Sequence, residues 1–415
     1  MKNYRDSGIR AAWTLREPRV FGRSRLAAAL LTAALAAGAS AAAALPAYAV
    51  SPEFARSAEE WAALQDNRME YWEIEGLIQE YNPTVQQNQY EYVKFRRDYG
   101  DTKDDVSGEY RRLADEIRSN IDYGFSEDDM MYATYAMQAV MAEMTAKQLD
   151  TQADNNLEDS EIRRLTYEMA EKALAQTAQN NFIGLHSAEL GVRQAELKQQ
   201  LSERNLAAAQ AQAAVGAGTQ IQVLNARQAL QDAEAAVITA GNTETTTKQK
   251  LQIMLGWKAD SLPEIGGAPA LDLTRIDSMD PAADLPQALE NNYTLRINKK
   301  KLQNATSETD VKTLQSTIAD NEARIASSLQ NVYLNVAAAK NTYLFQQSNA
   351  ALTAQTAAQT AQRYSLGTAS LLEYETAQNG AEQAQIALKQ SEYALLQAMN
   401  NYEWAVKGLA AAAAG

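Results

Sequence analysis

The chain has 415 residues, with no cysteine, one histidine, and 52 Asp and Glu residues against 38 Lys and Arg residues. Without cysteine the protein has neither disulfides nor thiol chemistry. A net charge of −14 at neutral pH disfavours nucleic acid as a partner, because phosphate backbones attract basic surfaces.

The first 49 residues have the order of a secretory signal peptide, which we expect at 1–49. A basic stretch ending at Arg25 precedes an apolar, alanine-rich stretch at 26–45, and Ala47-Tyr48-Ala49 forms a small-x-small cleavage site. The apolar stretch is also long enough for a retained membrane anchor, which is the alternative. In both cases the rest of the chain is exported. Cleavage removes seven basic and two acidic residues and leaves 31 Lys and Arg against 50 Asp and Glu.

Proline spacing divides the remaining chain into two halves. Only Pro83 lies between Pro52 and Pro263, and no proline follows Pro286. Proline is excluded from helix interiors, so two proline-free runs rich in Ala, Gln, Leu, Glu and Lys predict long helices. The predicted boundaries are 50–260 for the first half, 261–284 for the linker and 285–415 for the second half.

A 3.5-residue repeat predicts that these helices pack as coiled coils. Apolar side chains recur at spacings of four and three residues in the second half, and a second set keeps the same frame near the C-terminus. Such a repeat keeps one side of a helix against a partner helix. The first set is Ile325, Leu329, Val332, Val336, Ala339 and Tyr343, and the second is Leu388, Leu395, Met399, Tyr402 and Val406.

The two halves resemble each other in sequence. Asn82-Pro83 and Asn292-Tyr293 each offer a helix cap, and proline is favoured at the first helical position. Duplication of this kind predicts two copies of one helical-hairpin unit. Further matches, at a constant offset of 151 residues, pair Gly216, Ala226, Arg227 and Ala233 with Gly367, Ala377, Gln378 and Ala384.

Each unit is predicted to contain a long helix, a tight turn and a returning helix. The helices span about 161–214 and 220–256 in the first half, and about 306–365 and 370–407 in the second. Glycine supplies the positive φ at which a helix stops, and the Thr or Ser after it caps the returning helix. The turns are Val215-Gly216-Ala217-Gly218-Thr219 and Leu366-Gly367-Thr368-Ala369-Ser370.

An extra segment at about 100–160, predicted to be helical, makes the first half longer than the second. Its Met137, Met141 and Met144 follow helical spacing with Val140, and two more methionines precede them at 130 and 131. One interpretation is that these side chains pack an extra helix. The alternative is an adaptable docking surface, since methionine fills irregular interfaces.

No residue pattern predicts an enzyme, a cofactor or a metal site. His186 has no second His or Cys with which to form a metal site or a nucleophile–base pair, so we interpret it as a packing or solvated residue. Glu127-Asp128-Asp129 follow Ser126 at an apparent helix start, where acidic side chains complement the helix dipole. Calcium binding is the weaker alternative for them, because no loop has EF-hand spacing.

The two turns and their flanks resemble the hairpin tips of the TolC-like outer membrane efflux family. Residues 215–227 resemble the first tip, residues 364–374 resemble the second, and Asn82 and Asn292 stand where the family's repeats open. The resemblance implies an all-α fold of two tandem repeats of long antiparallel coiled-coil helical hairpins.

The sequence departs from the family in one respect. Family members insert two β-strands per half, and three protomers close a twelve-stranded barrel. A strand of such a barrel needs about ten residues of alternating character. Lys299, Glu308 and Asp310 stand where the second half would need an apolar band, and 100–160 is equally charged. We therefore predict a TolC-like fold without the β-barrel strands, which does not span an outer membrane by itself.

The resemblance implies a homotrimeric, passive export duct in the cell envelope, at the outer membrane if the family's usual location holds. In that family the hairpin tips meet a membrane-fusion (periplasmic adaptor) protein, which couples the duct to an inner-membrane pump. The alternative is an exported coiled-coil scaffold or adaptor that conducts nothing. The candidate adaptor-contacting residues are Val215, Gly216, Gly218, Thr219, Leu366, Gly367, Thr368 and Ser370.

Overall fold

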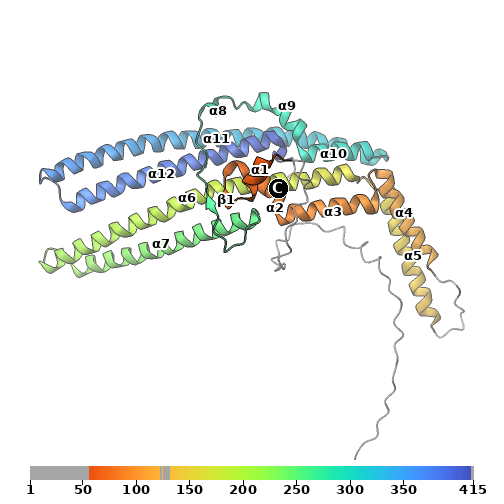
Figure 1. The fold of residues 1–415 in the computed structure, drawn as a ribbon, viewed down its shortest axis with the longest axis horizontal. Coiled ribbons are helices and arrows are strands. Elements are labelled where there is room, and N and C mark those ends of the chain that lie inside the picture. The colour runs from red at the N-terminus through yellow and green to blue at the C-terminus, as the bar shows by residue number, and fades with distance from the viewer. Residues whose placement is uncertain (1–55, 122–123, 125–130, 413–415) are drawn as a thin grey trace, which may run out of the picture. The chain divides into compact units, whose positions relative to one another are not determined.

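The computed structural model describes residues 56–121, 124 and 131–412. The predicted signal segment at 1–49, Met130 and the carboxylates at 127–129 lie outside the described residues. Within the described ranges the only strands are β1 (Arg68–Met69) and β2 (Glu264–Ile265), which pair in parallel, and the rest of the regular structure is helical (Figure 1). This confirms the all-α class. None of the helices placed by the structure is long and apolar enough to cross a bilayer.

The first half contains a long hairpin preceded by shorter helices. Its hairpin helices begin and end within two residues of the predicted positions. The helices are α1 (Ala58–Gln65), α2 (Ile74–Tyr81), α3 (Pro83–Tyr99), α4 (Lys103–Ser119), α5 (Tyr132–Asp154), α6 (Ser160–Ala214) and α7 (Gln220–Met254), with a 3₁₀ turn at Tyr71–Glu73.

The second half repeats this order without the α4–α5 pair. The predicted linker range, 261–284, holds β2, α8 and the first turn of α9, and three residues, 305–307, join α10 directly to α11. The α4–α5 hairpin is therefore the extra length of the first half. The helices are α8 (Thr274–Asp277), α9 (Pro281–Asn291), α10 (Tyr293–Asn304), α11 (Glu308–Ser365) and α12 (Leu371–Trp404), followed by a π-helical turn at Ala405–Leu409.

Asn82 caps helix α3 and also joins it to the end of α7, the last helix of the first repeat. Its side-chain oxygen accepts hydrogen bonds from the backbone N–H groups of Thr84 and Val85, which have no partner inside the helix. Its amide nitrogen donates to the carbonyl of Met254, the last residue of α7, at 2.8 Å. One buried side chain thus fixes the start of α3 against the end of α7.

Asn292 does the same in the second repeat. Its side-chain oxygen accepts from the N–H of Leu295, and its amide donates to the carbonyls of Gly408 and Ala410, just beyond α12. Asn292 is 1% exposed, so none of these bonds is replaced by water. The predicted caps are confirmed, and the structure adds their second role.

One glycine in each repeat, Gly256 in the first and Gly408 in the second, completes this contact, and neither was predicted from the sequence. Gly256 has φ = 88°, and a Cβ added there would lie 2.5 Å from the Cβ of Tyr81. Gly408 has φ = 116°, and its Cβ would lie 2.4 Å from the carbonyl oxygen of Asn291. Tyr81 and Asn291 directly precede the capping asparagines. Both repeats therefore need a residue without a side chain at the same place.

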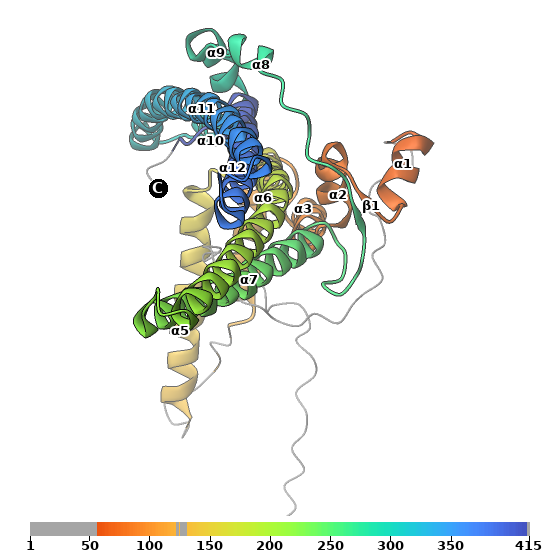
Figure 2. The same ribbon diagram turned by 90° about the vertical axis from the view of Figure 1, so that its left-hand side faces the viewer.

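The four long helices lie in the order α7, α6, α12, α11, and each neighbouring pair is antiparallel (Figures 1 and 2). The middle pair, α6 and α12, joins the two halves. Its contacts keep a nearly constant sum of residue numbers along the helices, as antiparallel packing requires. They include Asn180 with Asn400, Arg193 with Glu382 and Arg204 with Glu375.

Each half has its own hydrophobic core. In the second half Ile325, Leu329 and Val336 are fully buried and pack against α12, which confirms that the predicted coiled-coil seam is apolar packing surface. In the first half the core lies between α2, α6 and α7, and Trp404 of α12 enters it from the second half. The indole N–H of Trp404 donates to the Gln179 side chain at 2.8 Å.

The α4–α5 pair packs through small side chains. Ala146 and Leu149 of α5 are buried against Ala114 of α4. Four apolar residues of α5 are instead 59–64% exposed, so the interpretation that they pack an extra helix within the chain is wrong for them. They are Met137, Val140, Met141 and Met144.

We predict that Gly256→Ala destabilises the protein far more than Gly216→Ala. Both glycines have positive φ, which costs an alanine about 1–2 kcal/mol. Only at position 256 does the new methyl group also collide with backbone and Cβ atoms, so we expect roughly 2–4 kcal/mol there. Urea unfolding followed by circular dichroism measures both free energies of unfolding. Equal losses of stability in the two variants would contradict the close contact of Gly256 with Tyr81.

Candidate partner-binding site at the hairpin tips

The first hairpin ends in a glycine-based closure. Gly216 adopts φ = 75°, and the N–H groups of Ala217 and Gly218 both donate to the carbonyl of Gln212, at 2.8 and 3.0 Å. These bonds satisfy a carbonyl that the end of α6 leaves free. Added side-chain atoms at Gly216 would meet nothing within 4 Å, so the glycine serves the backbone turn and leaves open space outside it.

The second hairpin repeats this closure 151 residues later. Gly367 adopts φ = 72°, its N–H donates to the carbonyl of Tyr364, and the N–H of Thr368 donates to the carbonyl of Arg363 at 2.8 Å. Gly216 makes the matching bond to Ala213. The duplication inferred from sequence is therefore a duplication of backbone hydrogen bonds.

Both returning helices start with the predicted Thr or Ser cap, and the structure shows that each cap is reciprocal. Thr219 accepts from the N–H of Gln222, whose side chain accepts from the Thr219 N–H at 2.8 Å. Ser370 and Glu373 make the same pair of bonds, with the Ser370 N–H donating to the carboxylate at 2.7 Å. These caps hold the turn residues in one conformation.

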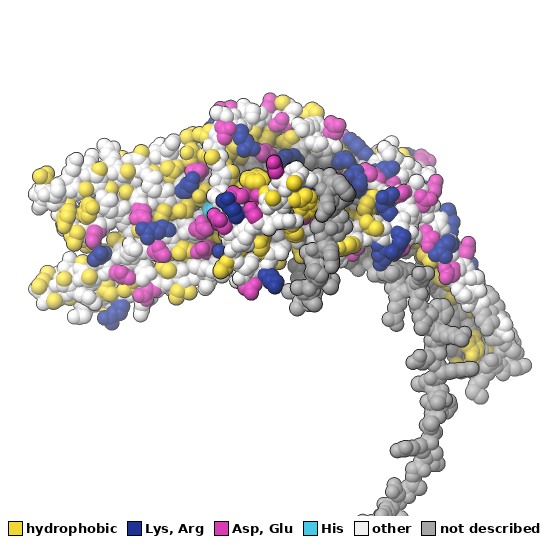
Figure 3. Space-filling model, in the orientation of Figure 1, with side chains coloured by type: hydrophobic (Ala, Val, Ile, Leu, Met, Phe, Trp, Pro, Cys, Tyr) yellow, Lys and Arg dark blue, Asp and Glu magenta, His cyan; other side chains and the backbone are white. Residues whose placement is uncertain are grey.

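Apolar side chains project from both tips. Val215 is 80% exposed and Leu366, its equivalent, is 77% exposed. Ile221 and Leu371 on the first turns of the returning helices are also exposed, and the space-filling view shows hydrophobic side chains at the ends of both hairpins (Figure 3). Exposed apolar side chains held at a fixed turn make these ends candidate contact sites.

The two tips differ in charge although their backbones agree. Residues 205–226 contain no charged side chain. The second tip has Arg363, which donates to the Thr368 carbonyl at 3.2 Å, and a stacked pair of rings, Tyr364 and Tyr374, with centroids 5.1 Å apart. One closure therefore presents an uncharged surface and the other a charged and aromatic surface.

The carboxylate of Glu373 is hydrogen-bonded to Ser370 in the second turn. Hydrogen bonds from the backbone and side chain of Ser370 lower the pKa of its carboxyl from the ordinary value of 4.5, and Arg363 contributes in the same direction. The carboxylate at this position is therefore a structural part of the turn.

Among the residues that the structure describes, no cluster of His, Asp and Glu could hold a metal ion. His186 packs against Phe182 and Tyr393, with its Nδ1 3.0 Å from the Glu189 carboxylate. It is a packing residue, in line with one of the two interpretations made from the sequence.

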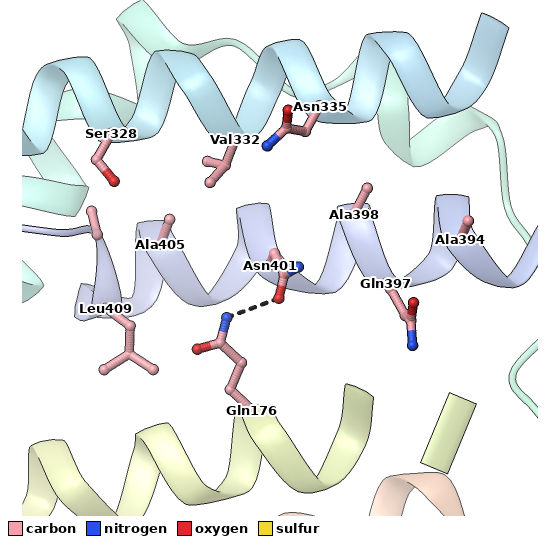
Figure 4. A pocket seen from close by; sticks show the side chains of 11 residues that line it. Gln176, Ser328, Val332, Asn335, Ala394, Gln397, Ala398, Asn401, Ala405 and Leu409 are labelled. Carbon is pink, nitrogen blue, oxygen red and sulfur yellow. Dashed lines mark hydrogen bonds between the residues drawn. The ribbon is translucent and has the colours of Figure 1, made fainter. Parts of the chain in front are cut away.

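A hollow of about 350 Å³ lies between α6, α11 and α12 (Figure 4). Alanines and side-chain amides line it, and Gln176 donates to the Asn401 side chain across it at 3.0 Å. It has no acidic or basic side chain, so it offers neither a general acid nor a general base.

All eight sequence-predicted site residues lie at the two tips, four at each. The ion pair between Arg204 and Glu375 joins α6 to α12 close to both turns, so the two tips share one end of the row of long helices. The structure thus places the eight residues at the same end of the row of long helices, on two separate turns. Their role as adaptor contacts stays a prediction.

Comparison with known proteins gives similarity in structure alone. No family model matches the chain, and no curated protein matches its sequence. A membrane protein from Pseudomonas aeruginosa is similar with a TM-score of 0.49 and 12% identity, over 81% of this chain and 90% of that one. The outer membrane protein VceC from Vibrio cholerae is similar with a TM-score of 0.48 and 11% identity, over 81% of this chain and 96% of that one. The Campylobacter jejuni CmeC outer membrane channel is similar with a TM-score of 0.43 and 10% identity, over 86% of this chain and 89% of that one.

We predict that acid loosens the second tip and leaves the first tip unchanged. A carboxyl whose pKa is lowered by folding stabilises the turn above its ordinary pKa and loses this effect as the pH falls through the lowered value. Between pH 6 and pH 3 the amides of Ser370 and Glu373 should lose hydrogen-exchange protection relative to those of Thr219 and Gln222. Glu373→Gln copies the first tip's cap and should remove this pH dependence; its persistence in that variant would contradict the assignment.

Proposed function

We propose that the chain is a subunit of a homotrimeric export duct, a passive conduit that links a membrane-fusion adaptor and an inner-membrane pump across the cell envelope. The observation that carries the proposal is the open row of four antiparallel helices. The middle helices, α6 and α12, pack against a long helix on each side, whereas α7 and α11 each pack against one long helix.

The two edge helices expose apolar side chains that a neighbouring copy would cover. Covering this apolar surface favours association by about 25 cal/mol per Å², offset by the entropy lost when two copies associate. When α7 of one copy meets α11 of the next, the contact is heterologous, and repetition around an axis closes a ring without free edges. The exposed residues are Leu224, Ile238 and Ile253 on α7 and Leu334, Leu344, Phe345 and Leu352 on α11.

The uncharged polar side chains of these helices support a water-filled interior. Thr239, Thr243 and Thr247 recur at one-turn spacing on α7, and each hydroxyl donates to a carbonyl of its own helix. Helix α11 has the same arrangement at Thr356 and Thr360. Hydroxyls held in this way keep lone pairs available for water and add no charge that would trap a solute.

The tips are where this proposal places the adaptor. Val215 and Leu366 give a helical partner two exposed apolar anchors held by rigid turns. Helical hairpins that meet end to end need such rigid turns, because a mobile tip loses entropy on docking.

We predict that residues 50–415 form a trimer with a central pore. Light scattering of the purified protein gives the mass, and electron microscopy shows whether an axial channel is present. A monomer or dimer at micromolar concentration, or a trimer without a channel, would refute the duct and leave the exported scaffold as the function.

The tips can be tested separately. A photo-reactive residue at Ala217, an exposed position of the first turn, should crosslink to a membrane-fusion protein in cells. Val215→Asp together with Leu366→Asp should reduce that crosslink at least about tenfold, since each carboxylate would be desolvated in the contact. Leu262→Asp, an equally exposed linker position, is the control and should leave the crosslink unchanged. Equal yields from all variants would exclude the tips as the contact.

A further inference from the structure

Helix α5 has two apolar faces, of which only one is covered by the residues that the structure describes. Ala146 and Leu149 lie on the face that packs against α4. Met137, Val140 and Met144 lie on the opposite face, since a rotation of about 100° per residue separates the two sets by about half a turn of the helix. Each of the three side chains, and Met141 beside them, is 59–64% exposed.

The exposed face has the spacing of a coiled-coil seam. Ala133, Met137, Val140 and Met144 follow one another at intervals of four, three and four residues. That interval keeps a stripe of side chains against a second α-helix along its length. The stripe is therefore shaped for a helix as partner.

Charge restricts the identity of that helix. Residues 132–142 contain no charged side chain, although the chain has a net charge of −14. The charged residues that follow on α5 are Glu143, Lys147, Asp150 and Asp154, so an anionic lipid surface is repelled. Two copies of this acidic chain meet with least repulsion at an uncharged, self-complementary stripe.

We propose that this stripe, Ala133, Met137, Val140 and Met144, is a self-association seam, on which the α5 helices of sister subunits pack against one another. The inference rests on the homotrimer of the proposed function and adds a second contact to it. In a cyclic assembly the three α5 helices are parallel, so residues of the same number lie in the same layer around the axis.

The hairpin is fixed to the rest of the chain at the end of α6 remote from the tip. Ser160 at the start of α6 donates to the carbonyl of Asp101, and the Asn156 amide donates to the carbonyl of Lys103 at 3.2 Å. The 55 residues of α6 then lead to the first tip, on the order of 80 Å away along the helix. The seam would hold the copies together at the opposite end from the adaptor contacts.

Ion pairs and the alanine contact hold α5 against α4, so the exposed stripe lies on a helix whose position is fixed. Arg118 pairs with Asp150 and with Glu143, and Arg111 pairs with Asp154 at 3.0 Å. None of these residues belongs to the stripe, so a substitution in the stripe leaves the hairpin's own contacts in place.

Site-specific crosslinking tests the seam, since the chain has no cysteine of its own. Residues 50–415 with Met144→Cys should form covalent dimers with a short thiol-to-thiol crosslinker, because the same residue of a sister subunit lies across the seam. Gln138→Cys, exposed on the same helix but outside the stripe, is the matched control. We expect the Met144→Cys yield to exceed that of Gln138→Cys by at least about tenfold.

The other outcomes separate this inference from the proposed function. Equal yields from the two variants in a protein that light scattering shows to be a trimer would overturn the seam and leave the duct. Equal yields from a monomer would overturn both. Crosslinking only between a mixture of Met137→Cys and Met144→Cys proteins would indicate antiparallel helices and overturn the cyclic seam. Sedimentation with phosphatidylcholine vesicles that Met141→Glu abolishes would assign the face to lipid instead.

Discussion

The antiparallel contact between α6 and α12 is the interaction on which the rest of the structure depends, because it makes one row of helices from two hairpins. It includes a network of side-chain amides. The Asn180 side chain bonds to Asn400 and Asn401, and Gln397 donates to the Asn180 carbonyl at 2.8 Å. Amide pairs of this kind are satisfied at one relative position of the helices and not after a shift of one turn. The network therefore sets the register that brings both tips to the same end, while Trp404 supplies apolar burial at its other end.

The turns and caps could be predicted from the sequence because they depend on neighbours in the chain. Gly216, Gly367, Thr219 and Ser370 have conformations decided within about five residues, and the 151-residue offset showed them twice. Gly256 and Gly408 could not be recognised in the same way, because their side chains are excluded by residues 175 and 117 positions earlier. The seam of α11 was visible as a periodicity, but a periodicity does not say which helix covers it. The same limit applied to the methionines of α5.

Duplication of the backbone with divergence of its surface explains how one scaffold provides two kinds of tip. The hydrogen bonds that end α6 and α11 are made by main-chain atoms, so they survive replacement of nearly every side chain around them. Only the glycine and the cap are restricted, and the cap tolerates both Gln222 and Glu373. Side chains that point outward, such as Leu366 or the rings of Tyr364 and Tyr374, are free to match different partners. A partner that binds both tips would therefore contact two turns with the same backbone geometry and different side chains.

The unequal halves also bear on symmetry. In the trimer proposed above, two similar hairpins per chain would make the tips nearly sixfold, since Gly216 and Gly367 close equivalent turns. The α4–α5 hairpin breaks this equivalence, because only the first half has it and three residues replace it in the second. If its exposed seam joins sister subunits, the assembly is threefold at that end and close to sixfold at the tips. The α5 seam would then be a second contact of threefold symmetry, in addition to the α7–α11 contacts that close the ring.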